Sequence, residues 1–94
     1  MVNRFVFVKL KDPADRGLVA SNAKSAFAAI EVVKGFDILT PADAGAEVWD
    51  LCFRVEFDGL ADVATYIDDP LHTAFVDETL ATRAEVKKAW NFTA

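Results

Sequence analysis

The sequence predicts an α+β fold, in which a four-stranded antiparallel sheet carries helices on one face. Two observations lead to this expectation. Segments with apolar residues at every second position, typical of strands, are interspersed with segments whose apolar residues recur every three or four positions, typical of helices. The 94 residues are enough for one core, and no linker or low-complexity stretch divides them, so we expect a single domain over residues 1–94.

The first predicted strand covers residues 4–10, and it is apolar on both faces. Two aromatic residues, Phe5 and Phe7, alternate with aliphatic residues at positions 6, 8 and 10. A strand of this kind must be covered on both sides. We therefore expect helices on one side of the sheet and a second sheet, from another copy of the chain, on the other.

The first predicted helix follows Asp12 and ends at Gly35. Asp12 is a suitable N-cap, Pro13 suits the first helical position, and Asp15 adds a negative charge to the first turn. Glycine is a common residue just past a helix end. Apolar residues spaced by three and four form one face of this helix: Val19, Ala23, Ala26, Phe27, Ile30 and Val33.

A short strand at 36–40 and a loop at 41–47 lead to the strand with the clearest alternation, at 48–58. One face of that strand should pack on the helices, and it carries Trp49, Leu51, Phe53, Val55 and Phe57. The other face should meet water, a ligand or a partner, and it carries Asp50, Cys52, Arg54, Glu56 and Asp58. Its charged residues either line an interior that holds a polar ligand or form ion pairs at or beside a dimer interface, and we favour ion pairs.

The remaining elements are two helices and a last strand. The helical pattern that starts after Gly59 stops at Asp69, because a residue before proline avoids the helical conformation. A second short helix runs from Pro70 to about Leu80, and residues 85–92 form the last strand. The order β-α-β-β-α-α-β is that of a ferredoxin-like sandwich.

Composition excludes several classes of function. The net charge is −5 and the basic residues form no stripe, so nucleic acid is not an expected partner. The apolar run at 5–10 is too short for a signal sequence or a membrane span, and the single cysteine, Cys52, agrees with a reducing compartment, so we expect a cytoplasmic protein. One His and one Cys show no metal-ligand spacing, and we expect neither metal nor cofactor. The 53% hydrophobic content favours an oligomer.

The only histidine, His72, and the only tyrosine, Tyr66, flank an Asp68-Asp69-Pro70 break and are the candidate catalytic pair. A neutral His72 could act as a general base while the Tyr66 hydroxyl donates to a developing oxyanion. The helix N-terminus would lower the pKa of His72 and the two aspartates would raise it, so both directions stay open. Alternatively, the histidine faces solvent and the tyrosine ring simply packs.

Parts of the sequence resemble the stress-responsive dimeric α/β barrel domain family: "RFVFVKLKD", "VWDLCFRVEFDGLADVATYIDDPLHTAFV" and "WNF". The family pattern Tyr-x-x-His-Pro-x-His aligns with residues 66–72, with Asp69 at its first histidine, and Arg4 stands where a histidine often begins the first strand. The resemblance implies a homodimer whose two sheets form a barrel. In one plant relative, olivetolic acid cyclase, a histidine and a tyrosine at positions matching His72 and Tyr66 close a polyketide by an aldol step.

Three functions remain open at this point. The leading expectation is a homodimer that binds a small apolar or aromatic molecule between sheet and helices, with Phe5, Phe7, Trp49 and Phe75 as pocket residues. The second is a cyclase- or lyase-like enzyme that acts on a polyketide-like substrate. The third is a structural, stress-associated dimer whose interior is filled by side chains.

Overall fold

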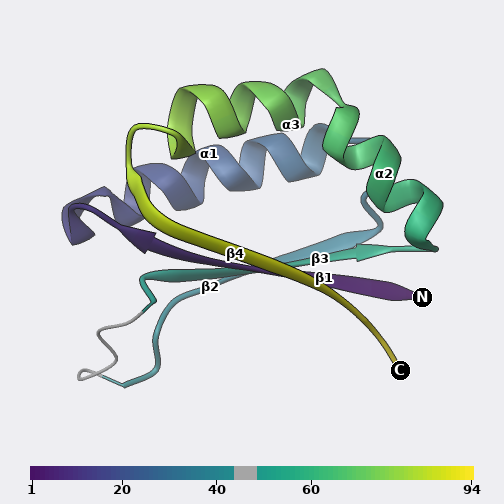
Figure 1. Ribbon diagram of the computed structural model, residues 1–94, viewed down its shortest axis with the longest axis horizontal. Helices are drawn as coiled ribbons and strands as arrows, with labels where there is room; N and C mark the ends of the chain where they lie inside the picture. Colours follow the sequence, from purple (N-terminus) through teal and green to yellow (C-terminus); the bar gives the residue numbers. More distant parts are fainter. Residues whose placement is uncertain (44–48) are drawn as a thin grey trace.

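The computed structural model describes residues 1–43 and 49–94 and confirms the predicted fold class (Figure 1). The elements follow one another in this order: β1 (Val2–Leu10), a 3₁₀ turn (Pro13–Asp15), α1 (Arg16–Ala29), β2 (Gly35–Leu39), β3 (Leu51–Phe57), α2 (Leu60–Asp68), α3 (Pro70–Phe75), a π-helical segment (Val76–Leu80) and β4 (Ala84–Thr93). The helices lie together over one face of the sheet, and the other face carries no element of the described chain (Figure 1).

The sheet has the strand order β2-β3-β1-β4, and all neighbouring strands are antiparallel. β1 is therefore a central strand, as its two apolar faces predict. Val6, Val8 and Leu10 are buried in the core under the helices, while Phe5 and Phe7 are half-buried on the open face. Helices on one face and an uncovered second face are the ferredoxin-like arrangement.

The first helix begins as predicted but ends earlier. Asp12 caps the 3₁₀ turn, where its Oδ1 accepts a hydrogen bond from the Ala14 N–H at 2.9 Å. The prediction that the helix continues to Gly35 is wrong, because α1 ends at Ala29 and Ile30 is already extended, with φ −84° and ψ 119°. β-branched residues at 30, 32 and 33 lose side-chain freedom in a helix, and the buried Ile30 packs into the core from its extended position. Gly35 instead begins β2.

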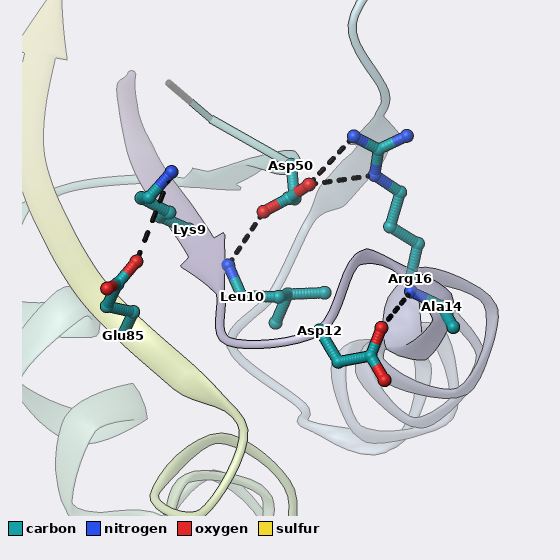
Figure 2. A network of polar contacts seen from close by, with 7 residues as sticks. All are labelled: Lys9, Leu10, Asp12, Ala14, Arg16, Asp50 and Glu85. Carbon is teal, nitrogen blue, oxygen red and sulfur yellow. Dashed lines mark hydrogen bonds and ion pairs between the residues drawn. The ribbon is translucent and has the colours of Figure 1, made fainter. Parts of the chain in front are cut away.

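The start of β3 also differs from the prediction (Figure 2). Val48 and most of the predicted loop at 41–47 lie outside the described residues, and the strand itself begins at Leu51. Asp50 does not join the polar face. It is only 5% exposed, and its Oδ2 accepts from the Leu10 N–H at 2.7 Å. Its Oδ1 accepts from the Arg16 guanidinium at 2.7 and 3.0 Å, so the carboxylate joins the end of β1 to the start of α1.

Burial by itself raises the pKa of the Asp50 carboxyl. The hydrogen bond from the Leu10 N–H and the hydrogen bonds and charge of Arg16 outweigh that effect and bring the pKa below its usual value. The other predicted charged residues of β3 also form ion pairs within the chain. Arg54 contacts the Asp37 carboxylate at 2.7 Å and the Glu56 carboxylate at 3.6 Å. Arg54 is thus paired with carboxylates of β2 and of its own strand, and whether these ion pairs lie at or beside a dimer interface stays a prediction.

The helices after β3 divide at Asp69, where the sequence predicts a break. Asp69 caps α3, and its Oδ1 accepts from the Leu71 N–H at 2.8 Å, with Pro70 at the first helical position. The predicted single helix from Pro70 to Leu80 is in fact α3 followed by a π-helical turn from Val76. π-helical turns widen the backbone locally and often lie beside functional sites.

Candidate ligand cavity

A cavity of about 220 Å³ lies between the sheet and the helices. Its walls are mostly apolar, and they include Val6, Phe27, Phe53, Phe75, Leu80 and Ala89. Among the described residues, four polar ones line it as well: Arg4, Tyr66, His72 and Lys87. An apolar chamber with a few convergent polar side chains is the usual form of a small-molecule site.

Phe27 of α1 contacts aromatic residues of the sheet, α2 and α3 around the cavity. Its ring lies 5.5 Å from that of Phe53 on the sheet, 5.9 Å from that of Phe75 on α3 and 6.1 Å from that of Tyr66 on α2, measured between centroids. These contacts are edge-on or tilted, which is the favourable geometry for aromatic pairs. The helical positions around the cavity are therefore fixed by ring packing on a buried residue of the longest helix.

His72 lies in the first turn of α3, at the place that the Asp69 cap and Pro70 determine. Its Nδ1 is 3.1 Å from the carbonyl oxygen of Ile67. A carbonyl oxygen can only accept, so Nδ1 carries the hydrogen and Nε2 is the unprotonated nitrogen of the neutral ring. The ring also packs against Tyr66, with centroids 4.3 Å apart. The histidine is held in one tautomer and one orientation.

The structure answers which way the pKa of His72 moves. Burial of the ring lowers the pKa, and the positive charges of Lys87 and Arg4 lower it further. The Ile67 carbonyl and the Asp69 charge act in the opposite direction but do not outweigh these effects. The ring is therefore neutral at neutral pH, as a general base requires.

Tyr66 projects from α2 into the same region and is only 1% exposed. Burial raises the pKa of its hydroxyl well above the ordinary value, although the nearby charge of Arg4 lowers it somewhat. The hydroxyl consequently keeps its proton at any physiological pH and can donate a hydrogen bond. Tyr66 and His72, predicted as a pair, are thus neighbours that line one cavity.

The pocket residues predicted from the sequence separate into two groups. Phe75 lines the cavity beside Tyr66 and His72. Phe5, Phe7 and Trp49 lie on the open face of the sheet, where the Phe7 ring is 5.6 Å from Trp49. The alternation predicted that Trp49 continues the helix-facing row of β3. That prediction is wrong, because Trp49 lies on the open face. Alternate residues of a strand point to opposite faces, so the odd positions of β1 cannot reach a cavity lined by Arg4 and Val6.

Sequence reasoning did not identify Arg4 and Lys87 as site residues. Arg4 is the one charged residue among the helix-facing positions of β1, and that interruption of an apolar row was the available signal. Lys87 stands in a Lys-Lys pair, and only the register of β4 with β1 distinguishes it from Lys88. Lys87 pairs with Val8, which places it on the helix-facing side, and Lys88 pairs with Phe7 on the open side.

Other kinds of site find no support in the described part of the chain. Within residues 1–43 and 49–94, no three or more His, Cys, Asp or Glu side chains gather where they could hold a metal ion. No helix in these ranges is long and apolar enough to cross a bilayer. Cys52 is a free, half-buried thiol on the open face, and burial raises its pKa, so it is not an activated nucleophile.

Comparison with known proteins adds a family to this geometry. The family model of the stress responsive A/B barrel domain matches residues 2–88. No curated protein matches the chain.

Three solved structures show the same fold. A Dabb-family protein with a ferredoxin-like fold from Mesorhizobium loti is 23% identical with a TM-score of 0.86, over 99% of this chain and 95% of that one. A dimeric protein of unknown function with a ferredoxin-like fold from Bacteroides fragilis is 26% identical with a TM-score of 0.81, over 99% and 95%. A hydroxynitrile lyase from Passiflora edulis is 15% identical with a TM-score of 0.80, over 97% and 90%. With a family model that spans all but its two ends, the chain belongs to the stress responsive A/B barrel domain family.

Proposed function

We propose that this chain forms a cytoplasmic homodimer that binds a small molecule with an apolar or aromatic body between the sheet and the helices. The cavity carries this proposal: about 220 Å³ of space with apolar walls and a Tyr-His pair. An engineered apolar cavity of about 150 Å³ holds benzene, so a ring with one or two substituents fits here. The free thiol of Cys52 suits a reducing compartment.

The dimer is supported by the open face of the sheet. Five aromatic residues form what we call the open-face aromatic cluster: Phe5, Phe7, Trp49, Trp90 and Phe92. Trp90 is 49% exposed and Phe92 57% exposed in the single chain. Contiguous apolar patches of this kind mark interaction sites on soluble proteins. The Bacteroides fragilis protein, which shares the fold, is dimeric. A second copy that packs its own cluster on this one would bury both.

Binding can be tested by filling the cavity. Small aromatic compounds are titrated into the protein and followed by calorimetry and by the ring resonances of the single histidine. Ala89 lines the cavity from β4, so Ala89→Leu should abolish binding by occupying the space. Ala28→Leu makes the same change on the exposed side of α1 and should leave binding unaltered. Failure of every compound at millimolar concentration would favour the structural dimer instead, and equal binding by both variants would mean that the compound binds outside this cavity.

The hydrogen bond between His72 Nδ1 and the Ile67 carbonyl supports a second candidate function, a lyase- or cyclase-like enzyme. His72 Nε2 would take a proton from a substrate O–H group, which leaves the negative charge on that oxygen. Alternatively, it would take a proton from a C–H bond next to a carbonyl group, and the charge would then develop on the carbonyl oxygen. The Tyr66 hydroxyl would donate to that oxygen. The Passiflora edulis hydroxynitrile lyase shares this fold, which supports the idea at the level of architecture.

This second function has its own test, once a compound that is turned over has been found. His72→Asn keeps a side-chain N–H for the Ile67 carbonyl but removes the base, so kcat should fall by about 10²–10⁴-fold. Tyr66→Phe keeps the buried ring and removes only the donor, with an expected loss of about 10²–10³-fold. Unchanged turnover in His72→Asn would eliminate His72 as the general base and with it this mechanism.

A further inference from the structure

The polar residues of the cavity have an unbalanced charge. Arg4 and Lys87 contribute two positive charges to its lining, His72 and Tyr66 are neutral, and none of the acidic side chains that the structure describes lines it. The chain as a whole is acidic, with a net charge of −5. A positive chamber within an acidic protein therefore reflects the placement of these two residues and not the overall composition.

Neither cation has a carboxylate partner among residues 1–43 and 49–94. The Arg4 guanidinium donates to the neutral amide oxygen of Asn91 at 3.1 Å, and Lys87 forms no ion pair there. The contrast with Arg54, which contacts two carboxylates on the open face, shows that the chain does neutralise an arginine elsewhere. Arg4 is half-buried in a central strand, where an unpaired charge is costly.

The two positive charges affect the pKa values of side chains that line the cavity. Both Arg4 and Lys87 lower the pKa of His72, and Arg4 also lowers that of Tyr66. Two cations on neighbouring strands thus act on His72 of α3, and Arg4 acts on Tyr66 of α2 as well. An anion placed among these four residues would meet the positive charges on one side and the Tyr66 hydroxyl on the other.

We propose that the cavity is selective for a small organic anion, a carboxylate carried on a compact apolar body and paired with Arg4 and Lys87. This inference rests on the proposed binding function and names its ligand class. A guanidinium fits the two oxygens of a carboxylate with parallel hydrogen bonds, and Arg4 uses only one of its nitrogens for Asn91. Lys87 is exposed and lines the cavity too, so it stands at the opening, where a charged headgroup enters.

The test compares ligands of the same shape and different charge. Benzoate and benzamide are titrated into the purified full chain by calorimetry, followed by phenylacetate and its amide. Benzoate should bind at least about tenfold more tightly than benzamide, which is the effect of one charge-assisted hydrogen bond. Its affinity should also fall as salt is added, while that of benzamide should not.

Charge variants show whether these two residues are responsible. Lys87→Gln should weaken benzoate by about tenfold without affecting benzamide, and Arg4→Gln should have a similar effect. Lys88→Gln is the matched control, because Lys88 is the adjacent lysine on the opposite face of β4. Since Lys87 is exposed, its replacement leaves the core intact and the result does not depend on the stability of the Arg4 variant.

The single histidine provides an independent readout. A bound anion favours the imidazolium form, so benzoate should raise the pKa of His72 and benzamide should not. If both ligands bind with equal affinity, the charge selection is overturned and the binding function stands. If the anion binds no more weakly to Lys87→Gln and Arg4→Gln than to the unmodified chain, the assignment to these residues is overturned. If neither class binds at millimolar concentration, both proposals fail together.

Discussion

A backbone carbonyl determines the chemistry of the one histidine. The Ile67 oxygen, 3.1 Å from Nδ1, fixes the tautomer, and burial among cations keeps the ring unprotonated. Such an environment favours the neutral base over the charged form. It also means that the charge state of His72 reports on its neighbours, because few groups act on it: Arg4 from β1, Lys87 from β4, and Asp69 at the start of its own helix.

The pKa of His72 should therefore lie below the ordinary value of 6.5. Between the folded pKa and 6.5 the unfolded chain binds more protons than the folded one, so stability rises with pH through this window and is lost as pH falls. A proton NMR titration of the ring measures the pKa directly. Lys87→Gln should raise it, and Lys88→Gln should leave it unchanged. A measured value at or above 6.5 would contradict the buried, cation-flanked position.

Asp50 is the second residue with an effect that can be isolated. Asp50→Ala leaves the Leu10 N–H without its acceptor and Arg16 without its partner, so the free energy of unfolding should fall by about 2 kcal/mol. Asp58→Ala is the control, since Asp58 forms only an exposed pair with Lys34 at 3.9 Å and should cost no more than about 0.5 kcal/mol. Urea unfolding of both variants measures the difference.

The dependence of the free energy of unfolding on acidic pH should change as well. The folded pKa of Asp50 is lowered from 3.8, so its contribution is present above that value and is lost as pH falls through the folded pKa. Asp50→Ala should consequently lose less stability on acidification than the unmodified chain does. The hydrogen bonds indicate that the Asp50 carboxylate is ionised in the folded chain. If both proteins lose the same free energy of unfolding on acidification, that conclusion is contradicted.

Among the elements, those with a local repeat could be predicted from the sequence and those shaped by distant partners could not. Alternation was sufficient for β1, where most helix-facing positions are buried, and the apolar positions Val86, Trp90 and Phe92 were sufficient for β4. Ile30 continues the helical spacing of α1, yet it is extended in the structure. Asp50 continues the alternation of β3, but it accepts hydrogen bonds from Leu10 and Arg16, residues that no local pattern connects with it.

The candidate site shows the same division. Tyr66 and His72 were identified because each is the only residue of its type and because both match a family pattern. Arg4 and Lys87 join them only through the pairing of β1 with β4. Phe5, Phe7 and Trp49 were expected in the pocket because they are aromatic, whereas strand register places them on the opposite face. Which face a residue takes is a property of the sheet and not of the residue type.

The start of α3 allows an element-scale prediction that separates two roles of Asp69. Asp69→Ala removes the cap on the Leu71 N–H and should lower the free energy of unfolding by about 1 kcal/mol. Asp69→Asn keeps a capping oxygen but removes the charge, so it should retain stability while lowering the pKa of His72. Thermal unfolding and the NMR titration measure the two effects. Equal stability loss in both variants would mean that the charge, and not the cap, stabilises α3.

At the scale of the whole molecule, the two faces of the sheet have different tasks. The helix-facing side holds the cavity, and the open side carries the open-face aromatic cluster together with the ion pairs of Arg54. A partner that covers the open face would leave the cavity accessible, because the helices lie on the opposite side of the sheet (Figure 1). Assembly and ligand binding can therefore be altered independently.

Light scattering at micromolar concentration should give the mass of a dimer. Trp90→Glu places a charge within the open-face aromatic cluster and should shift the protein to a monomer. Leu71→Glu is the control, because Leu71 is 45% exposed, close to the 49% of Trp90, but lies on α3 away from the sheet. A dimer that survives Trp90→Glu and dissociates with Leu71→Glu would move the interface to the helices.

The neighbourhood of the first and last strands has a consequence for how the chain acquires its structure. β1 pairs with β4 from Val2 opposite Thr93 to Leu10 opposite Ala84, so the contacts of the longest sequence separation join the central strand β1 to the edge strand β4. Closing so long a loop is entropically costly, and folding should be slow for a domain of this size. During synthesis, one edge of the apolar strand β1 stays unpaired until residues 84–93 have emerged from the ribosome. That interval is when the nascent chain is most exposed to aggregation and most in need of a chaperone.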